Sequence, residues 1–231
     1  MMDKVCRLEE LQKEFRSGQT VLVGGFGVPG TPFTLVDALL ASGASDLTLI
    51  RNDANRVGMG VSKLIEAGRV ARIITTHLGR NPIAIEMMNR GEIQVEFFPQ
   101  GILAEKIRAG GAGLFGFLTD IGFDTILRDK KRVITLDGRS LIMEPALRAD
   151  IALIHGAVGD RSGNLIYEKS ARNFNPLMAT AADRVIAEVE KVASTGELPP
   201  DGIHTPGAFV DRVVVLEKLA DEYGVLKDNV L

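Results

Sequence analysis

The chain has 231 residues, of which 45% are hydrophobic and 25% are charged, and its formal net charge is −3. This composition suffices for a substantial hydrophobic core, and the balanced charge, with no basic tract, argues against a nucleic-acid partner. Since no apolar run approaches the roughly 18 residues that a membrane span needs, we also expect no membrane partner.

The beginning of the chain and its cysteine content bear on the cellular compartment. The opening stretch MMDKVCRLEELQKEF is charged and lacks the apolar segment of a secretory signal. A lone cysteine, Cys6, cannot form an internal disulfide, which is typical of a reducing environment. We therefore expect a cytoplasmic protein.

Helices are predicted from apolar residues at helical spacing and from the residues that flank them. Thr31-Pro32 favours a helix start with Thr31 as the N-cap and Pro32 at the first helical position, and Asn81-Pro82 repeats this signal. The predicted helices are Leu8–Arg16, Phe33–Leu40, Ile83–Asn89 and Ile102–Ala109.

Strands are predicted where β-branched and apolar residues cluster between these helices. Several are near-continuous hydrophobic runs, as expected of parallel strands that are buried on both faces. The predicted strands are Thr20–Val23, Leu47–Ile50, Val70–Thr76, Ile93–Phe98, Val133–Leu136, Leu141–Met143, Ile151–Ile154, Leu165–Tyr167 and Val185–Val189. A further strand and helix are expected after the loop near Ala193–Asp201.

The alternation of strand and helix defines the expected fold class. It predicts an α/β protein with an open, mainly parallel sheet flanked by helices. Val133–Leu136 and Arg139–Met143 are joined by Asp137-Gly138, a dipeptide typical of a two-residue hairpin turn, so a β-hairpin subregion interrupts this pattern. We expect residues 1–231 to form a single domain.

A glycine-rich loop follows the first predicted strand. Gly25, Gly27 and Gly30 fit the G-x-G-x-x-G spacing of a dinucleotide-binding turn, and Asp53 stands where such proteins carry a ribose-binding acid. However, Pro32 sets the helix start after all three glycines, and Pro29 lacks an N–H for a phosphate. From the pattern alone, an NAD-dependent oxidoreductase, a ligand loop of another kind and a plain connection all remain open.

Motifs along nearly the whole chain resemble those of the type I (3-oxoacid) CoA-transferases, in their α subunit. Within this family, the stretch Thr76–Pro82 is most similar to the bacterial acetate/acetoacetate (short-chain acyl) branch. The matching blocks are Gly24-Gly25-Phe26, Gly30-Thr31-Pro32, Leu49–Ala54, Phe98–Glu105, Arg108–Gly113, Ala171–Pro176, His204–Gly207 and Val210-Asp211-Arg212.

This resemblance implies a fold shared with certain sugar-phosphate isomerases, and an enzyme that moves CoA between short-chain acids such as acetate, butyrate and acetoacetate. The reaction would be ping-pong, through a glutamyl-CoA thioester, with acyl-CoA and a carboxylate as substrates, coenzyme A as a substrate rather than a permanently bound cofactor, and no metal. Gln100 is the candidate oxyanion donor, and Asn52 and Gln100 are candidates for substrate binding. The candidates for CoA binding are Gly24, Gly25, Phe26, Gly27, Val28, Pro29 and Gly30.

The nucleophile of this family lies in an S/A-E-N-G-type motif of the β half, which is absent from this sequence. Glu105, which lies near Gln100 in the sequence, is expected on a helix surface. We therefore expect the catalytic glutamate on a partner β subunit, in an α2β2 assembly. Two features stay open: whether Arg172–Pro176 lies at the site or an interface, and what the departure from the family pattern at Thr119–Thr125 changes.

Two other classes remain as alternatives to the CoA-transferase subunit. One is an NAD-dependent oxidoreductase that uses the Gly25/Gly27/Gly30 loop. The other is a non-catalytic binding protein or a sugar-phosphate isomerase relative on the same fold. The three histidines, His77, His155 and His204, do not have the spacing of metal ligands.

Overall fold

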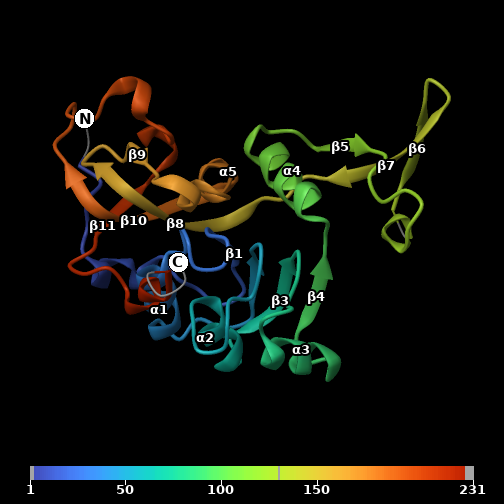
Figure 1. Ribbon diagram of the computed structural model, residues 1–231, viewed down its shortest axis with the longest axis horizontal. Helices are drawn as coiled ribbons and strands as arrows, with labels where there is room; N and C mark the ends of the chain where they lie inside the picture. The colour runs from blue at the N-terminus through green and yellow to red at the C-terminus, as the bar shows by residue number, and fades with distance from the viewer. Residues whose placement is uncertain (1–2, 130, 227–231) are drawn as a thin grey trace.

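The computed structural model describes residues 3–129 and 131–226, and within them an eight-stranded sheet forms the body of the molecule (Figure 1). Its strand order is β11-β10-β8-β1-β2-β3-β4, all paired in parallel, while β9 pairs antiparallel with β8. The strands are β1 Thr20–Val23, β2 Leu47–Ile50, β3 Val70–Thr75, β4 Gln94–Phe97, β8 Ala149–Asp160, β9 Leu165–Ile166, β10 Ala182–Ala193 and β11 Arg212–Val215. The predicted fold class is confirmed.

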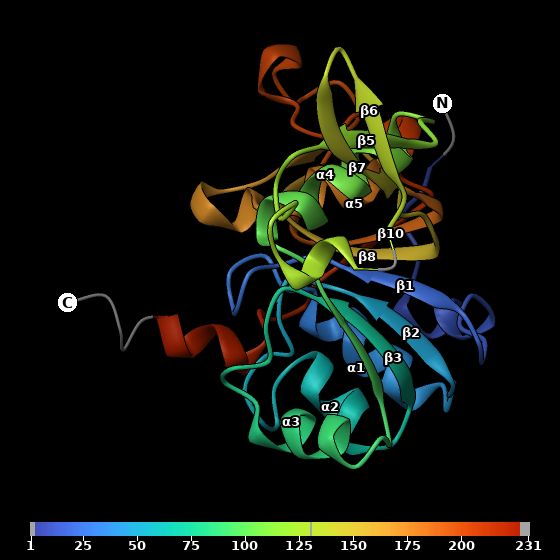
Figure 2. The same cartoon turned by 90° about the vertical axis from the view of Figure 1, so that its right-hand side faces the viewer.

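Helices cover both faces of this sheet (Figure 2). One face carries α1 Phe33–Ala41, α2 Val61–Glu66 and α3 Pro82–Asn89, and the other carries α4 Gln100–Gly111 and α5 Asn175–Thr180. The 3-10 helices are η1 Leu8–Lys13, η2 Ile126–Arg128, η3 Lys169–Arg172, η4 Pro200–Gly202, η5 Gly207–Phe209 and η6 Asp221–Leu226. None of the helices in the described ranges is long and apolar enough to cross a membrane.

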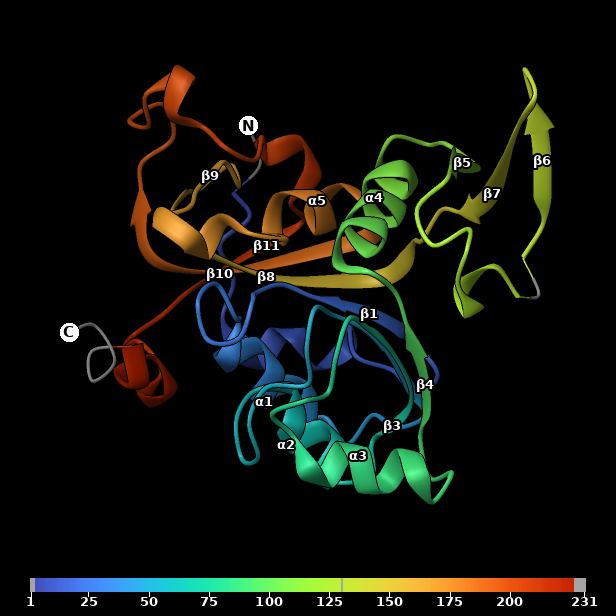
Figure 3. The ribbon, with the colours of Figure 1, turned by 45° about the vertical axis from the view of Figure 1, so that its right-hand side comes forward.

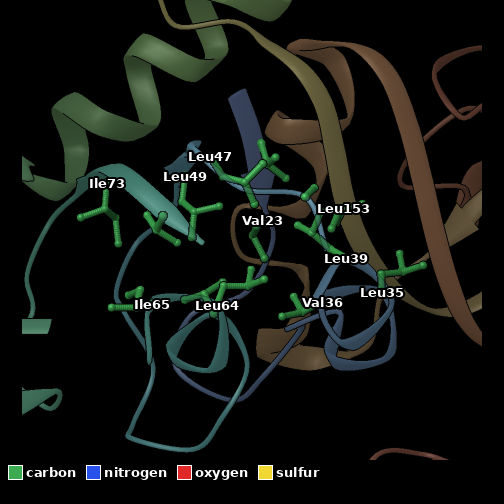
Figure 4. Packing of buried hydrophobic residues seen from close by; sticks show 14 of the residues in the cluster. Val23, Leu35, Val36, Leu39, Leu47, Leu49, Leu64, Ile65, Ile73 and Leu153 are labelled. Carbon is green, nitrogen blue, oxygen red and sulfur yellow. The ribbon is translucent and has the colours of Figure 1, made fainter. Parts of the chain in front are cut away.

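The hydrophobic core is divided by the sheet into two clusters. Successive residues of a strand point to opposite faces, so Val21 and Val23 join one cluster while Leu22 joins the other. Figure 4 shows the first cluster, in which strand residues such as Val23 and Leu49 pack against Leu35 of α1 and Leu64 of α2. Burial on both faces explains why these strands are continuous apolar runs in the sequence.

The predicted hairpin is present and belongs to a separate three-stranded antiparallel sheet, ordered β5-β7-β6. Its strands are β5 Gly116–Thr119, β6 Val133–Leu136 and β7 Arg139–Pro145. Asp137 and Gly138 adopt φ angles of 48° and 76°, as a type I′ turn requires. We call this sheet, with the loops that connect its strands, the arm, because it projects from the body beside α4 (Figure 3).

A buried ion pair holds the root of the arm to the body. Lys106 of α4 donates to Glu144 of β7 at 2.9 Å, and both side chains are almost fully buried. Lys131 pairs with the same carboxylate, and both ammonium groups lie over the ring of Phe98. Much of the arm is exposed and apolar, at Leu118, Ile121, Ile126, Val133 and Leu136, and Leu114 and Phe115 are exposed just before β5.

Some local predictions differ from the structure. The helix expected at Leu8–Arg16 is a shorter 3-10 helix, and Thr31 is not an N-cap. Its hydroxyl instead donates to the carbonyl of Gly27 at 2.8 Å, because the loop folds back over it. The signal at Asn81-Pro82 is confirmed, since the Asn81 side chain accepts a hydrogen bond from the N–H of Ala84.

Candidate active site

The glycine loop, residues 24–30, leaves the carboxyl end of β1 and leads into α1. Gly25, Gly27 and Gly30 have φ angles of 104°, 61° and 70°, a region that favours glycine. The helix begins only at Phe33, after all three glycines. The loop is therefore wider than a dinucleotide-binding turn, in which the helix N-terminus meets the pyrophosphate directly.

Arg51, which directly follows β2, holds the loop through hydrogen bonds from its guanidinium group. The side chain is fully buried and donates to the carbonyls of Gly24 and Gly27, the second at 2.9 Å, and to the hydroxyl of Thr31 at 2.8 Å. Burial holds the pKa of Arg51 below its ordinary value, although the nearby Asp53 acts to raise it. One guanidinium thus fixes the carbonyls at the loop's start and middle, together with the residue that follows it.

Asp53 holds the same loop through its N–H groups. Its carboxylate accepts from the N–H of Gly27 at 2.8 Å and from the N–H of Asn55 at 2.9 Å. Burial acts to raise the pKa of Asp53, but Arg51 and these N–H donors, with the amide of Asn52, outweigh it and hold the pKa below its ordinary value. The carboxylate that could have met a ribose, and the N–H that could have met a phosphate, are therefore bonded to each other.

The Ala171–Pro176 block holds the other end of the loop. Asn173 donates to the carbonyl of Pro29 at 2.9 Å, and the buried Asn175 donates to that of Gly30 at 3.0 Å. The backbone N–H of His155 donates to the Oδ1 of Asn175 at 3.1 Å, which ties the block to β8. Both asparagines therefore act on the glycine loop, a role that their sequence context did not distinguish from a subunit contact.

Gln100 and Asn52, the two candidates for substrate binding, lie together. Gln100 is exposed at the start of α4, and its Nε2 donates to the Oδ1 of Asn52 at 2.6 Å. Asn52 is fully buried, and its Nδ2 donates to Asp53 at 3.1 Å. A chain of hydrogen bonds thus runs from Gln100 through Asn52 and Asp53 to the N–H of Gly27. Gln100 is the exposed side chain of this series of hydrogen bonds, whereas Asp53 and Gly27 are the members that line the cavity.

A cavity of about 740 Å³ opens beside the loop. Its walls are mostly apolar side chains, and its polar members come from the segments after β2 and β3. The lining residues are Phe26, Gly27, Val28, Pro29, Asp53, Ala54, Asn55, Arg56, Met59, His77, Leu78 and Arg80. Of the residues expected to bind CoA, Phe26 to Pro29 line this cavity, whereas Gly24, Gly25 and Gly30 are buried behind it.

Sequence reasoning missed a buried charged group that holds the start of α1. The carboxylate of Glu188, from β10, accepts from the N–H of Leu35 at 3.0 Å and lies 2.9 Å from the Nδ1 of His155. The His155 Nε2 lies 3.2 Å from Glu190. Burial would lower the pKa of His155, but the two carboxylates raise it to about 9, while burial raises the pKa of Glu188.

The C-terminal segment also reaches this group. The ring of Tyr223 lies 5.1 Å from that of His155 and meets Phe33 edge-on at 5.1 Å. Its hydroxyl donates to the carbonyl of Thr31 at 2.6 Å. Thr31, the residue that follows the glycine loop, is therefore held by Arg51 at the end of β2 and by Tyr223 of the C-terminal segment.

Other candidates lie apart from the cavity. Glu105 is paired with Arg108 on the surface of α4, at 2.8 Å, as expected of a helix-surface residue. The unusual stretch 119–125 belongs to the arm and does not line the cavity. Within residues 3–129 and 131–226, no group of three or more histidine, cysteine, aspartate or glutamate side chains is arranged to hold a metal ion.

Comparison with known proteins assigns the family. The coenzyme A transferase family profile matches residues 7–216, so this chain belongs to the coenzyme A transferase family. It is 49% identical to the alpha chain of an acetate CoA-transferase from Escherichia coli K12, over 94% of this chain and 99% of the relative. It is 39% identical to the alpha chain of an acetoacetyl-CoA:acetate/butyrate CoA transferase from Clostridium acetobutylicum, over 93% and 98% of the two chains. The resemblance to this family is thus confirmed, and the oxidoreductase alternative has no support.

The fold also matches that of solved structures. An acyl-CoA transferase of Escherichia coli O157:H7, crystallised as a thioester complex with CoA, superposes with a TM-score of 0.85 at 23% identity. The match covers 96% of this chain and 49% of that one. This chain therefore spans about half the length of that solved polypeptide.

Proposed function

We propose that this chain is the α subunit of an acyl-CoA:carboxylate CoA-transferase that acts on short-chain acids such as acetate, butyrate and acetoacetate. The observation that carries the proposal is the hydrogen-bonded chain that joins Gln100, Asn52 and Asp53 to the glycine loop beside an apolar cavity. An apolar cavity with few convergent polar groups is the usual form of a small-molecule site. Relatives named as CoA-transferase α subunits support the same assignment.

In the proposed reaction, a glutamate carboxylate attacks the carbonyl carbon of acyl-CoA, the C–S bond breaks, and CoA leaves as a thiolate. The thiolate then attacks the glutamyl carbonyl of the mixed anhydride and releases the first acid, which leaves glutamyl-CoA. A second carboxylate reverses these steps. Each attack produces a tetrahedral oxyanion, and we assign to the free N–H of Gln100 the stabilisation of that charge.

The role of Asn52 in this proposal is to position Gln100. Asn52 is fully buried and its amide is shared between Gln100 and Asp53, so it fixes the orientation of the Gln100 side chain. Contact between Asn52 and the substrate stays a prediction from the sequence. Its amide oxygen accepts from Gln100 so that the remaining N–H of Gln100 is free for the reaction.

We infer that the nucleophile comes from a β subunit. The sequence lacks the motif that carries the glutamate in this family, and the relatives are named as single subunits of a transferase. The exposed apolar side chains on the arm are of the kind that subunit contacts bury. An α2β2 assembly in the cytoplasm is our proposal for the complete enzyme.

The test is a transfer assay with the β subunit present. The purified complex should exchange CoA between acetoacetyl-CoA and acetate or butyrate, measured by loss of acetoacetyl-CoA absorbance. Calorimetry should also detect CoA binding and no NADH binding. A complex that binds NADH and transfers no CoA between any acyl donor and carboxylate would contradict the proposal.

A further inference from the structure

The cavity beside the glycine loop has a positively charged mouth. Its acidic and amide side chains, Asp53 and Asn55, already hydrogen-bond to the loop backbone. Asp53 accepts from the N–H of Gly27, and Asn55 donates to the Gly27 carbonyl at 2.7 Å. The polar side chains that remain at the mouth are those of Arg56, His77 and Arg80, all exposed.

The two arginines at this mouth have no counter-ion within residues 3–129 and 131–226. Neither Arg56 nor Arg80 makes a side-chain hydrogen bond or ion pair with any residue in the described ranges. Asp53, the carboxylate in the cavity lining, is already paired with Arg51 at 3.8 Å and with N–H donors. The positive charge at the mouth is therefore available to a ligand.

The walls behind the arginines are apolar. Phe26 is 46% exposed at the cavity, and Val28, Met59 and Leu78 contribute further apolar surface. A ligand that fits this arrangement has an apolar segment that ends in an anionic group. A guanidinium recognises carboxylate and phosphate oxygens through paired N–H donors, so both kinds of oxyanion match.

We propose that Arg56 and Arg80 bind an oxyanion of the substrate that takes no part in the transfer itself. This inference rests on the proposed function, because it assigns a ligand to the same cavity. The oxyanion has two possible sources, namely the distal carboxylate of a dicarboxylic acyl group and the phosphates of CoA. With the first source, the arginines set the preference between mono- and dicarboxylic acids. With the second, they set the affinity for every CoA ester.

The experiment compares the wild-type complex with the double variant Arg56→Gln, Arg80→Gln. Arg16→Gln is the matched control, because Arg16 is exposed and does not line the cavity. Butyrate and succinate serve as acceptors of equal chain length, the first without and the second with a distal carboxylate. Acetoacetyl-CoA and acetoacetyl-pantetheine serve as donors with and without phosphates. KM and kcat are measured for each.

We expect the double variant to raise one KM about tenfold or more, as the loss of charge-assisted hydrogen bonds implies. A rise for succinate but not for butyrate assigns the distal carboxylate. A rise for acetoacetyl-CoA but not for its pantetheine analogue assigns the phosphates. Unchanged KM values for all four substrates, or a rise that Arg16→Gln reproduces, would overturn the proposal.

Direct binding separates this inference from the proposed function. Calorimetry on the isolated chain with CoA, dephospho-CoA, succinate and butyrate requires no transfer activity. If the wild-type complex transfers no CoA but the double variant still loses binding of an anionic ligand, the proposed function fails and the anion site stands. If transfer is normal and binding is the same in the double variant and the wild type, only the anion site fails.

Discussion

At the scale of single residues, Gln100 combines exposure with a fixed orientation. Its Nε2 donates to the buried Asn52 while the side chain stays open to solvent. If it donates to the reaction oxyanion, Gln100→Ala should lower kcat by about 10² to 10³, the usual effect of removing one such donor. Steady-state kinetics of the complex measures this change. The melting temperature should stay close to that of the wild type, since the removed side chain is exposed.

The control for this variant is Gln94→Ala, which removes an exposed glutamine from β4 that is not part of the hydrogen-bonded series through Asn52 and Asp53. Its kcat should equal that of the wild type. A Gln100→Ala enzyme with near-normal turnover would remove Gln100 from the chemical step.

The glycines of the loop divide into two kinds, although their sequence contexts are similar. A Cβ on Gly25 would meet the backbone N and Cα of Thr31 at 2.9 and 2.8 Å, whereas a Cβ on Gly27 would meet open space. Gly25→Ala should therefore lower the melting temperature clearly. Gly27→Ala should cost only about 1 kcal/mol for its positive φ, and should weaken CoA binding by shifting the loop.

Thermal melts and calorimetry with CoA separate these two effects. Gly43→Ala is the matched control for Gly27→Ala, because Gly43 has a φ of 77°, open space around its Cβ and no part in the cavity. Both variants carry the same backbone strain, so only Gly27→Ala should lose affinity. Equal CoA affinity in the two would remove the loop from ligand binding.

At the scale of elements, a buried charge joins β8 and β10 to the start of α1. His155 lies between Glu188 and Glu190, and Glu188 accepts from the N–H of Leu35. The folded-state pKa of His155 is raised from 6.5 to about 9. The stabilisation from its proton is therefore complete below about pH 6.5 and is lost as the pH rises through about 9.

This linkage predicts how the melting temperature depends on pH. The wild type should be more stable than His155→Asn by a few kcal/mol at pH 6.5, and the difference should shrink towards pH 10. Thermal melts of both proteins between pH 6 and pH 10 measure it. Using the difference between the two proteins removes the titration of groups that do not interact with His155. A difference that stays constant over this range would show that His155 carries no extra proton in the folded state.

The elements that could be predicted are those whose signals are local. The Asp137-Gly138 turn and the Asn81 cap depend on residues within a few positions of each other, and both are present. The helices α2 and α5 were not predicted, because each has six residues and too few turns to show a period. The strand β8 extends beyond its predicted apolar centre because ten of its residues pair with β10, a contact that the local sequence does not encode.

At the scale of the whole molecule, the site too combines parts with local sequence signals and parts that depend on contacts between distant residues. The glycine loop and Gln100 were identified from short motifs, and the structure joins them through Asn52 and Asp53. The side chains that hold the loop and the start of α1 could not be assigned to them from the sequence, because they are distant in the chain. Glu188 lies 153 residues from its partner Leu35, and Asn175 lies 145 residues from Gly30. Only the parallel order of β1, β8 and β10 brings these groups together.

The last prediction concerns the division of the reaction between two chains. The isolated chain carries the cavity and Gln100, the proposed oxyanion donor, but its sequence lacks the family's glutamate motif. We therefore expect that the purified chain alone transfers no CoA, and that adding the β subunit restores transfer. Robust activity from the isolated chain would contradict this division.

Chemical trapping locates the nucleophile. Borohydride reduces a glutamyl thioester but not a free carboxylate, so it should inactivate the complex only after acyl-CoA has been added. Mass spectrometry should then find the reduced glutamate in the β subunit. The matched control is the complex treated with borohydride and free acid, which forms no thioester and should keep its activity. A reduced glutamate within this chain, for example at Glu105 near Gln100, would place the nucleophile here and reverse the assignment, because this one chain would then carry both the nucleophile and the oxyanion donor.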